Sequence, residues 1–242
     1  MLFKKEYEIK YYEQNVLGYL KESTLLNFLQ DAATLSAESL GFGPTFVFSK
    51  NYAWVVLKYH IELYTRINNC NSITITTEPR GVSRLYAFRD FYIYSQSGDL
   101  IGKVISTWAL IDMNTRKILP VQKVLPMMFP YEKRENELEY IKFGDVENPI
   151  YSKEYIVKFD DVDVNKHANN SNYIVWALDS LPVDFRINNF VKTIDLKFKK
   201  EAFVETKIKV ISDINQNYSC HKIFSCSNNE ELANIYAEWQ QC

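Results

Sequence analysis

Three polar side chains alternate in the second half of the chain: Asp163, Asn165 and His167. In an extended segment alternate side chains share one face, so these three groups would project together. They precede an expected helix start at Asn169 or Asn170, where backbone N–H groups are unpaired and the helix dipole is positive. A base, a group that orients it and donors for an oxyanion are the parts that acyl transfer needs. The competing interpretation is helix capping, which also favours Asp and Asn in such a stretch.

An internal repeat helps to decide between acyl-transfer chemistry and helix capping. Residues 7–32 align with residues 155–180 at a constant offset of 148, without gaps. In this frame Asn15, Leu17 and Tyr19 occupy the positions of the polar trio. One copy therefore carries the trio and the other lacks it, which favours a function over a purely structural role.

Each copy predicts one helix. In the first, Leu25, Phe28 and Leu29 recur at three- and four-residue spacing, and Ser23 or Thr24 is the expected N-cap. The second is expected from about Asn169 or Asn170 to Leu181, where Pro182 stops it.

About four strands are expected after each helix, separated by turn signals. The expected strands are residues 54–64, 72–79, 86–94 and 100–112 in the first half, and 192–199, 204–211, 219–225 and 232–240 in the second. Each half is thus an α+β unit with an antiparallel sheet against one long helix. We expect a first domain at residues 1–121, a linker at 122–150 and a second domain at 151–242. The charge cluster from Glu132 to Glu139 is expected to be a solvated face of the linker.

Composition excludes several classes. The net charge of −2 and pI near 6.0 give no basic field for nucleic acid. No apolar stretch reaches membrane-spanning length and no secretory signal is seen, so we expect a cytoplasmic protein without a membrane partner. Its four cysteines form no CxxC pair, and we expect neither disulfide, metal nor cofactor.

The stretch from Asp163 to Asn170, continuing to Tyr173, Ile174 and Trp176, resembles the acyl-acyl carrier protein thioesterases of plants and bacteria. Their pattern here is D-x-N-x-H-x-N-N followed by Y-I-x-W. The first half adds weaker similarities at residues 29–33, 54–57 and 106–112. The resemblance implies two tandem hotdog domains and the hydrolysis of fatty acyl-acyl carrier protein to free fatty acid.

The resemblance also implies a catalytic Glu followed by Cys, and the matching positions are Glu201 and Ala202. The missing thiol argues against a Cys–His nucleophile and favours an activated water. Glu201 or His167 would be the base, Asp163 would hold the histidine or the water, and Asn165 would position the carbonyl oxygen. Strand alternation places Glu201 on the face of Lys197 and Lys199, so a bulge or strand end must redirect it.

The implied partner is acyl carrier protein, whose acidic surface could dock on lysines of the second half: Lys192, Lys197, Lys199, Lys200, Lys207 and Lys209. The acyl chain is expected in the first hotdog. Alternatives are an acyl-CoA thioesterase, a hotdog enoyl hydratase and a non-catalytic acyl-binding protein. The hydratase is disfavoured because its D-x-N-P-x-H spacing is absent. The sequence leaves chain-length preference and a homodimer open.

Overall fold

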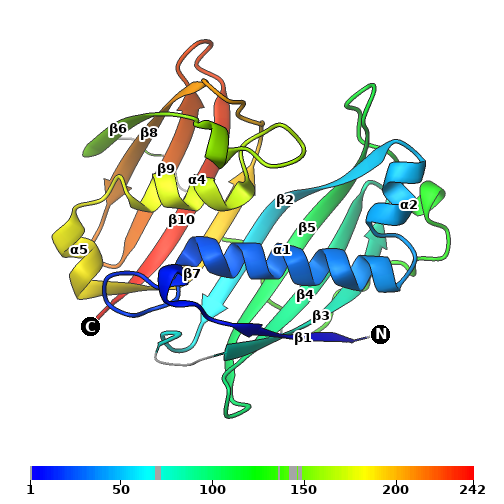
Figure 1. The fold of residues 1–242 in the computed structure, drawn as a ribbon, viewed down its shortest axis with the longest axis horizontal. Helices are drawn as coiled ribbons and strands as arrows, with labels where there is room; N and C mark the ends of the chain where they lie inside the picture. Colours follow the sequence, from blue (N-terminus) through cyan, green and yellow to red (C-terminus); the bar gives the residue numbers. More distant parts are fainter. Residues whose placement is uncertain (1, 69–71, 136, 142–145, 147–148) are drawn as a thin grey trace.

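The computed structural model describes residues 2–68, 72–135, 137–141, 146 and 149–242. One antiparallel sheet of ten strands runs through the molecule in the order β1-β3-β4-β5-β2-β7-β10-β9-β8-β6 (Figure 1). The strands of the first half are β1 (Phe3–Glu8), β2 (Tyr52–Leu63), β3 (Ser72–Ser83), β4 (Tyr86–Tyr94) and β5 (Leu100–Asp112). Those of the second are β6 (Tyr151–Ile156), β7 (Asn189–Phe198), β8 (Lys207–Ile214), β9 (Tyr218–Ser225) and β10 (Glu231–Gln241).

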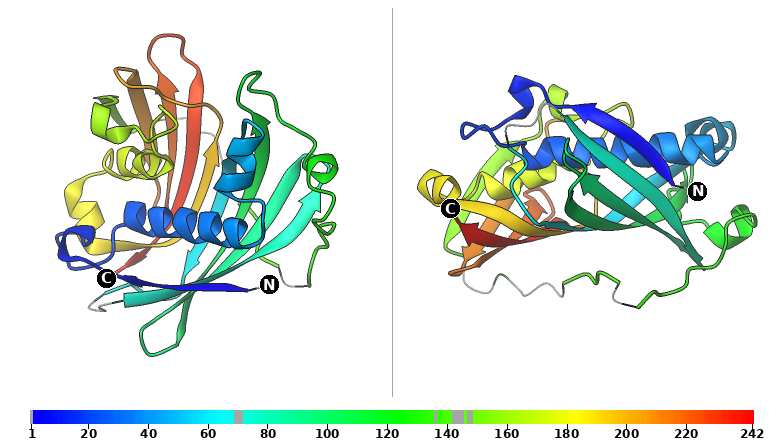
Figure 2. Two further views of the ribbon diagram at one scale, coloured as in Figure 1. Left: turned by 45° about the vertical axis from the view of Figure 1, so that its right-hand side comes forward. Right: turned by 90° about the horizontal axis from the view of Figure 1, so that it is seen from below.

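The two halves contribute corresponding strands. From one edge the order is β1, β3, β4, β5, β2, and from the other edge it is β6, β8, β9, β10, β7. The two halves meet where β2 pairs with β7, with His60 opposite Asp195 in the register. The helices are α1 (Glu22–Ser39), α2 (Pro44–Ser49), α3 (Val121–Val124), α4 (Asn170–Leu178) and α5 (Val183–Asn188). The two long helices, α1 and α4, lie on the same face of the sheet (Figures 1 and 2). Each half is therefore a hotdog, as the sequence predicted.

Helix α1 buries an apolar stripe against the sheet, including Leu25, Leu26 and Leu29, each at most 2% exposed. The expected N-cap at Ser23 or Thr24 is wrong, because the helix already begins at Glu22 after an extended Lys21. Helix α4 starts where the sequence predicted but ends at Leu178, three residues before the expected end.

The strand predictions are largely confirmed, and the bounds of β4 and β5 match those expected. Residues 3–8 and 151–156, which precede the two helices, form the edge strands β1 and β6, so each half has five strands rather than the four expected. Strand β8 begins at Lys207 instead of at position 204, because residues 203–206 form a turn in which Thr206 N–H donates to the Phe203 carbonyl.

The described parts of the segment between the halves lie on the face of the sheet opposite the helices (Figure 2). The expectation that its charges are all solvated is wrong for Glu137, whose side chain is 8% exposed and lies 3.5 Å from buried Arg80. Arg80 also donates to Asp90 on the neighbouring strand at 2.6 Å. Farther along, the Ile141 N–H donates to the buried Asp195 carboxylate. The linker thus docks on the sheet through buried polar groups.

Candidate active site

Residues 163–167 form a tight turn, so the predicted extended segment is wrong. Asp163 N–H donates to the His167 carbonyl at 3.1 Å, and Lys166 N–H donates to the Asp163 carbonyl at 2.9 Å. Lys166 has φ of +69°, which closes the turn. The Asp163 carboxylate accepts from Asn165 N–H at 2.8 Å and from the Asn165 side-chain amide at 3.3 Å. Asp163 and Asn165 are therefore coupled to each other by the turn rather than aligned along a strand.

The first copy of the repeat makes the same turn. Asn15 N–H donates to the Tyr19 carbonyl at 2.8 Å, and Leu17 N–H donates to the Asn15 side-chain oxygen at 3.0 Å. Gly18, with φ of +78°, stands where the second copy has Lys166. The backbone of this turn is therefore a property of the repeat, and what distinguishes the second copy is its side chains.

His167 and Glu201 are brought together. His167 Nε2 lies 3.2 Å from Glu201 Oε1, and the two side chains are 18% and 30% exposed. Strand β7 ends at Phe198, so Glu201 lies beyond the alternation that would have placed it with Lys197 and Lys199. The strand end that the sequence analysis required is present.

Sequence reasoning missed Arg116. This residue follows β5 of the first half in a turn where Arg116 N–H donates to the Asp112 carbonyl. Its guanidinium pairs with Oε2 of Glu201, so the Glu201 carboxylate lies between His167 of its own half and an arginine of the other half. Arg116 has φ of +57°. Nothing in the local sequence marks it, since its partner is distant in the chain.

The start of α4 supplies fewer free donors than expected. Ala168 N–H donates to the Ala202 carbonyl at 2.7 Å, and Asn169 N–H donates to the Asp161 carbonyl. Ser171 N–H donates to the side chain of Asn169, the helix N-cap. The capping interpretation is thus correct for Asn169. Asp163, Asn165 and His167 take no part in this capping hydrogen bond.

Position 202, where the resembled family has a cysteine, is a fully buried alanine. Ala202 N–H donates to the Tyr173 hydroxyl at 3.0 Å, and its carbonyl accepts from Ala168. These bonds tie the loop of Glu201 to the turn of His167. Burial raises the pKa of the Tyr173 hydroxyl, which therefore stays a neutral donor and acceptor.

The other two histidines are buried elsewhere and hydrogen-bonded within the sheet. His60 Nδ1 lies 2.6 Å from Asp195 Oδ2, and this hydrogen bond raises the pKa of His60 against the opposing effect of burial. His221 contacts the Ser212 and Ser219 hydroxyls at 2.7 and 2.8 Å. Burial lowers the pKa of His221 to about 3. Both are therefore structural residues of the sheet.

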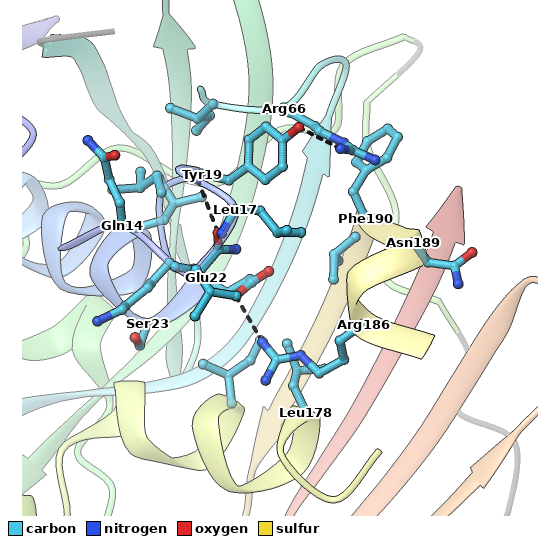
Figure 3. Close-up of a pocket in the computed structure, with 18 of the residues that line it drawn as sticks. Gln14, Leu17, Tyr19, Glu22, Ser23, Arg66, Leu178, Arg186, Asn189 and Phe190 are labelled. Atoms are coloured by element: carbon cyan, nitrogen blue, oxygen red, sulfur yellow. Dashed lines mark hydrogen bonds and ion pairs between the residues drawn. The ribbon is translucent and has the colours of Figure 1, made fainter. Parts of the chain in front are cut away.

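A cavity of about 580 Å³ lies between the two halves on the helix side (Figure 3). Helices α1, α4 and α5 and the adjoining ends of β2 and β7 line it, and none of the four predicted site residues does. A second cavity of about 60 Å³ lies inside the first hotdog, between α1 and strands β2, β3, β4 and β5. Its walls include Trp54, Trp108 and Met128, together with the buried Arg89, which donates to Ser36 and Thr77.

The lysines proposed for docking are partly engaged. Lys199 pairs with Glu231 at 2.6 Å and Lys200 with Glu230 at 3.1 Å, whereas Lys192, Lys207 and Lys209 are exposed. Within the described ranges, no three His, Cys, Asp or Glu side chains gather as a metal site would require. None of the helices in that part of the chain is long and apolar enough to span a membrane.

Comparison with known proteins gives a consistent result. A family model described as the acyl-ACP thioesterase N-terminal domain matches residues 1–126, and one described as the C-terminal domain matches residues 146–241. A chloroplastic oleoyl-acyl carrier protein thioesterase of Coriandrum sativum is 26% identical over 83% of this chain and 59% of the relative. A chloroplastic palmitoyl-acyl carrier protein thioesterase of Gossypium hirsutum is 22% identical over 99% and 64%, respectively.

Two solved structures share the fold over nearly the whole chain. An acyl-ACP thioesterase from Bacteroides thetaiotaomicron has a TM-score of 0.86 at 21% identity, covering 99% of this chain and 98% of its own. The 12:0-ACP thioesterase from Umbellularia californica has a TM-score of 0.85 at 17% identity, covering 100% and 98%. The chain spans about three fifths of the length of the first plant relatives.

Proposed function

The chain belongs to the acyl-ACP thioesterase family, and from this premise we propose that it hydrolyses fatty acyl-acyl carrier protein to a free fatty acid and the carrier thiol. The observation that carries the proposal is the contact between His167 and Glu201. His167 comes from a turn and Glu201 follows the end of β7, and we call the place where they meet the second corner. The first copy of the repeat has Tyr19 and Arg66 at the corresponding places, and neither is a general base at neutral pH.

The reaction would use water as the nucleophile. Glu201 or His167 takes a proton from the water as its oxygen attacks the thioester carbon, and the other residue orients the base. The tetrahedral oxyanion then collapses and expels the thiolate, which needs little acid assistance because alkyl thiols have a pKa near roughly 8.5. Arg116 contributes a positive charge at this corner while the oxyanion develops.

Asn165 would contact the substrate from the same turn, and Asp163 would hold Asn165 in place. The Asn165 amide is exposed and held by the Asp163 carboxylate, so its remaining hydrogen-bonding capacity can position the thioester carbonyl. Asp163 then acts as a positioning residue for Asn165. This differs from the sequence-based hypothesis, in which Asp163 held the histidine or the water.

We assign the acyl chain to the 60 Å³ cavity of the first hotdog, which adjoins the strand ends that carry the Arg116 turn. A cavity of this size holds only the volume of about two waters, so side chains around it must move to admit a long chain. Acyl carrier protein would dock near the exposed lysines of the second half. The cytoplasmic location stays a prediction from the sequence, and a homodimer stays open.

The direct test is turnover of purified protein on acyl carrier protein thioesters from short to long chains. We expect fatty acid release by the wild type and a loss of at least about 100-fold in kcat/KM for His167→Ala, the scale of general acid–base catalysis. Thermal unfolding would verify that the variant is folded. Undiminished turnover by folded His167→Ala would overturn the assignment.

Two further arms refine the result. Comparing kcat/KM for one acyl group on the carrier protein and on coenzyme A separates the proposed substrate from the acyl-CoA alternative. Binding of acyl chains without any turnover would favour the non-catalytic alternative.

A further inference from the structure

The 580 Å³ cavity between the two halves is large enough for a ligand. Its volume falls within the roughly 300–1,000 Å³ that small-molecule sites occupy. Apolar side chains from both halves line most of it, including Leu25, Val175 and Leu178. Others lie partly open to solvent at its edge, such as Val183 at 70% exposed and Leu17 at 40% exposed. Apolar surface left open in a concavity is typical of a binding site.

This cavity contains the counterpart of the candidate active site. Its wall includes the first-copy turn, with Asn15, Leu17 and Tyr19 at the positions of Asp163, Asn165 and His167. Arg66 follows the end of β2 by three residues, as Glu201 follows the end of β7. Arg66 donates to the Tyr19 hydroxyl at 2.7 Å, in the place where His167 meets Glu201 (Figure 3). The corner is thus kept, with an arginine in the place of the carboxylate.

Arg66 is a cation available to a ligand. Its guanidinium lies 4.7 Å from the ring centres of both Tyr19 and Phe190, which hold it in place. It also contacts the Cys242 sulfur. Within the part of the chain that the structure describes, it forms no ion pair with a carboxylate. Because guanidinium groups favour carboxylates through paired hydrogen bonds, an anion with a planar oxygen pair suits this position.

The other positive charges of the cavity wall are Arg186 and Lys21. Arg186 pairs with Asp179 and lies 3.7 Å from Glu22, so its charge is already matched (Figure 3). Burial raises the pKa of Glu22 against the opposing effect of Arg186. Lys21 donates to the Tyr12 carbonyl at 2.8 Å, so Arg66 and Lys21 are the cations of the wall that have no carboxylate partner among the described residues. The rest of the wall is mostly apolar.

We propose that this cavity is a second ligand site, which binds a single-chain fatty carboxylate with its head on Arg66 and its chain along α4 and α5. Such a ligand is also the product of the proposed hydrolysis, so the site would let the protein respond to free fatty acid. The binding itself does not depend on the hydrolysis being correct. A ligand such as coenzyme A, with its large polar body, fits the apolar walls poorly.

The test is a titration of the full chain with dodecanoate, followed by the NMR signal of the Trp239 indole N–H. Trp239 lines the cavity, and its indole donates to Ser219 at 2.9 Å, so its signal reports binding there and not at His167. We expect a saturable shift with wild type. Arg66→Gln should weaken dodecanoate binding at least tenfold, whereas the matched control Arg84→Gln, an exposed arginine on another turn, should change it less than twofold.

Dodecanol and coenzyme A are the comparison ligands. Dodecanol should bind at least tenfold more weakly than dodecanoate and should not respond to Arg66→Gln. Should that variant unfold, Arg66→Lys, which keeps the charge, and Val183→Trp, which narrows the cavity from an exposed position, replace it. The lysine variant should bind and the tryptophan variant should not. Absence of a saturable shift, equal effects of Arg66→Gln and Arg84→Gln, or tighter binding of coenzyme A would each overturn the proposal.

Discussion

The turns at residues 14–20 and 162–168 have one backbone and two sets of side chains. Each is closed by an isolated bridge, Gln14 with Leu20 and Val162 with Ala168, at the offset of 148. In each, an Asn or Asp side chain accepts a hydrogen bond from the N–H two residues on. The shared bond shows that Asp163 has a structural role which Asn15 fulfils equally well. Chemistry specific to the second turn must therefore come from its other contacts, such as that of His167 with Glu201.

The two corners also differ in charge. Beside the second turn a carboxylate, Glu201, meets an imidazole and an arginine, whereas beside the first turn an arginine meets a tyrosine. A duplicated scaffold has thus placed a base at one corner and a cation at the other. This difference predicts that one corner acts on a thioester while the other holds an anion.

The largest expected effect comes from removing the carboxylate of the second corner. Glu201→Gln keeps the size of the side chain but abolishes its basicity, and we expect kcat/KM to fall by about 10²- to 10⁴-fold. Glu205→Gln, the same change at an exposed position of the same loop, is the control and should retain full activity. Equal activity of Glu201→Gln and Glu205→Gln would show that the reaction does not need the Glu201 carboxylate.

Acid should act on the two halves in opposite ways. The pKa of His221 is lowered to about 3, so the native protein stays neutral there while the unfolded chain binds a proton below about pH 6.5. Stability is therefore lost as pH falls through this window, by about 3 kcal/mol between pH 7.5 and 4.5. His60 of the first half has a raised pKa, and its contribution is instead lost as pH rises.

Urea unfolding at the two pH values would measure this effect. His221→Asn should remove most of the extra loss of stability in acid, because asparagine does not titrate. If wild type and His221→Asn lose equal free energy of unfolding between pH 7.5 and 4.5, burial does not hold this histidine neutral.

The paired turns allow a matched separation of structure from chemistry. Asn15→Ala removes the hydrogen bonds from the Leu17 and Tyr19 N–H groups, and Asp163→Ala removes those from the backbone and side-chain N–H groups of Asn165. Each variant should lower the free energy of unfolding by about 1 kcal/mol. Asp163→Ala should also lower kcat/KM about tenfold, since Asn165 loses its anchor. A similar loss of kcat/KM in Asn15→Ala would argue against a specific role for Asp163.

The smallest effect concerns backbone strain. Gly18 and Lys166 both have positive φ, a conformation that costs a non-glycine residue roughly 1–2 kcal/mol. Gly18→Ala should therefore destabilise the protein by about 1 kcal/mol, whereas Lys166→Gly should leave stability unchanged or raise it slightly. Thermal unfolding of both variants would reveal whether the turns carry the same strain.

The sequence by itself determined most local structure. The alternation of β4 and β5, the start of α4 and the 148-residue offset all follow from side-chain periodicity and turn residues, which act over a few positions. The same local signals singled out Asp163, Asn165 and His167. They could not show that these residues form a turn, because an Asp-rich stretch favours a turn and an extended strand end alike.

Only the tertiary structure decided which distant groups meet. Alternation grouped Glu201 with surface lysines, and the end of β7 turned it toward His167 instead. Arg116 is separated from Glu201 by 85 positions and reaches it because β2 and β7 join two sheets into one. The docking of Glu137 and the cavity beside Arg66 arise in the same way, since these contacts depend on how strands and helices pack and not on neighbouring residues in the sequence.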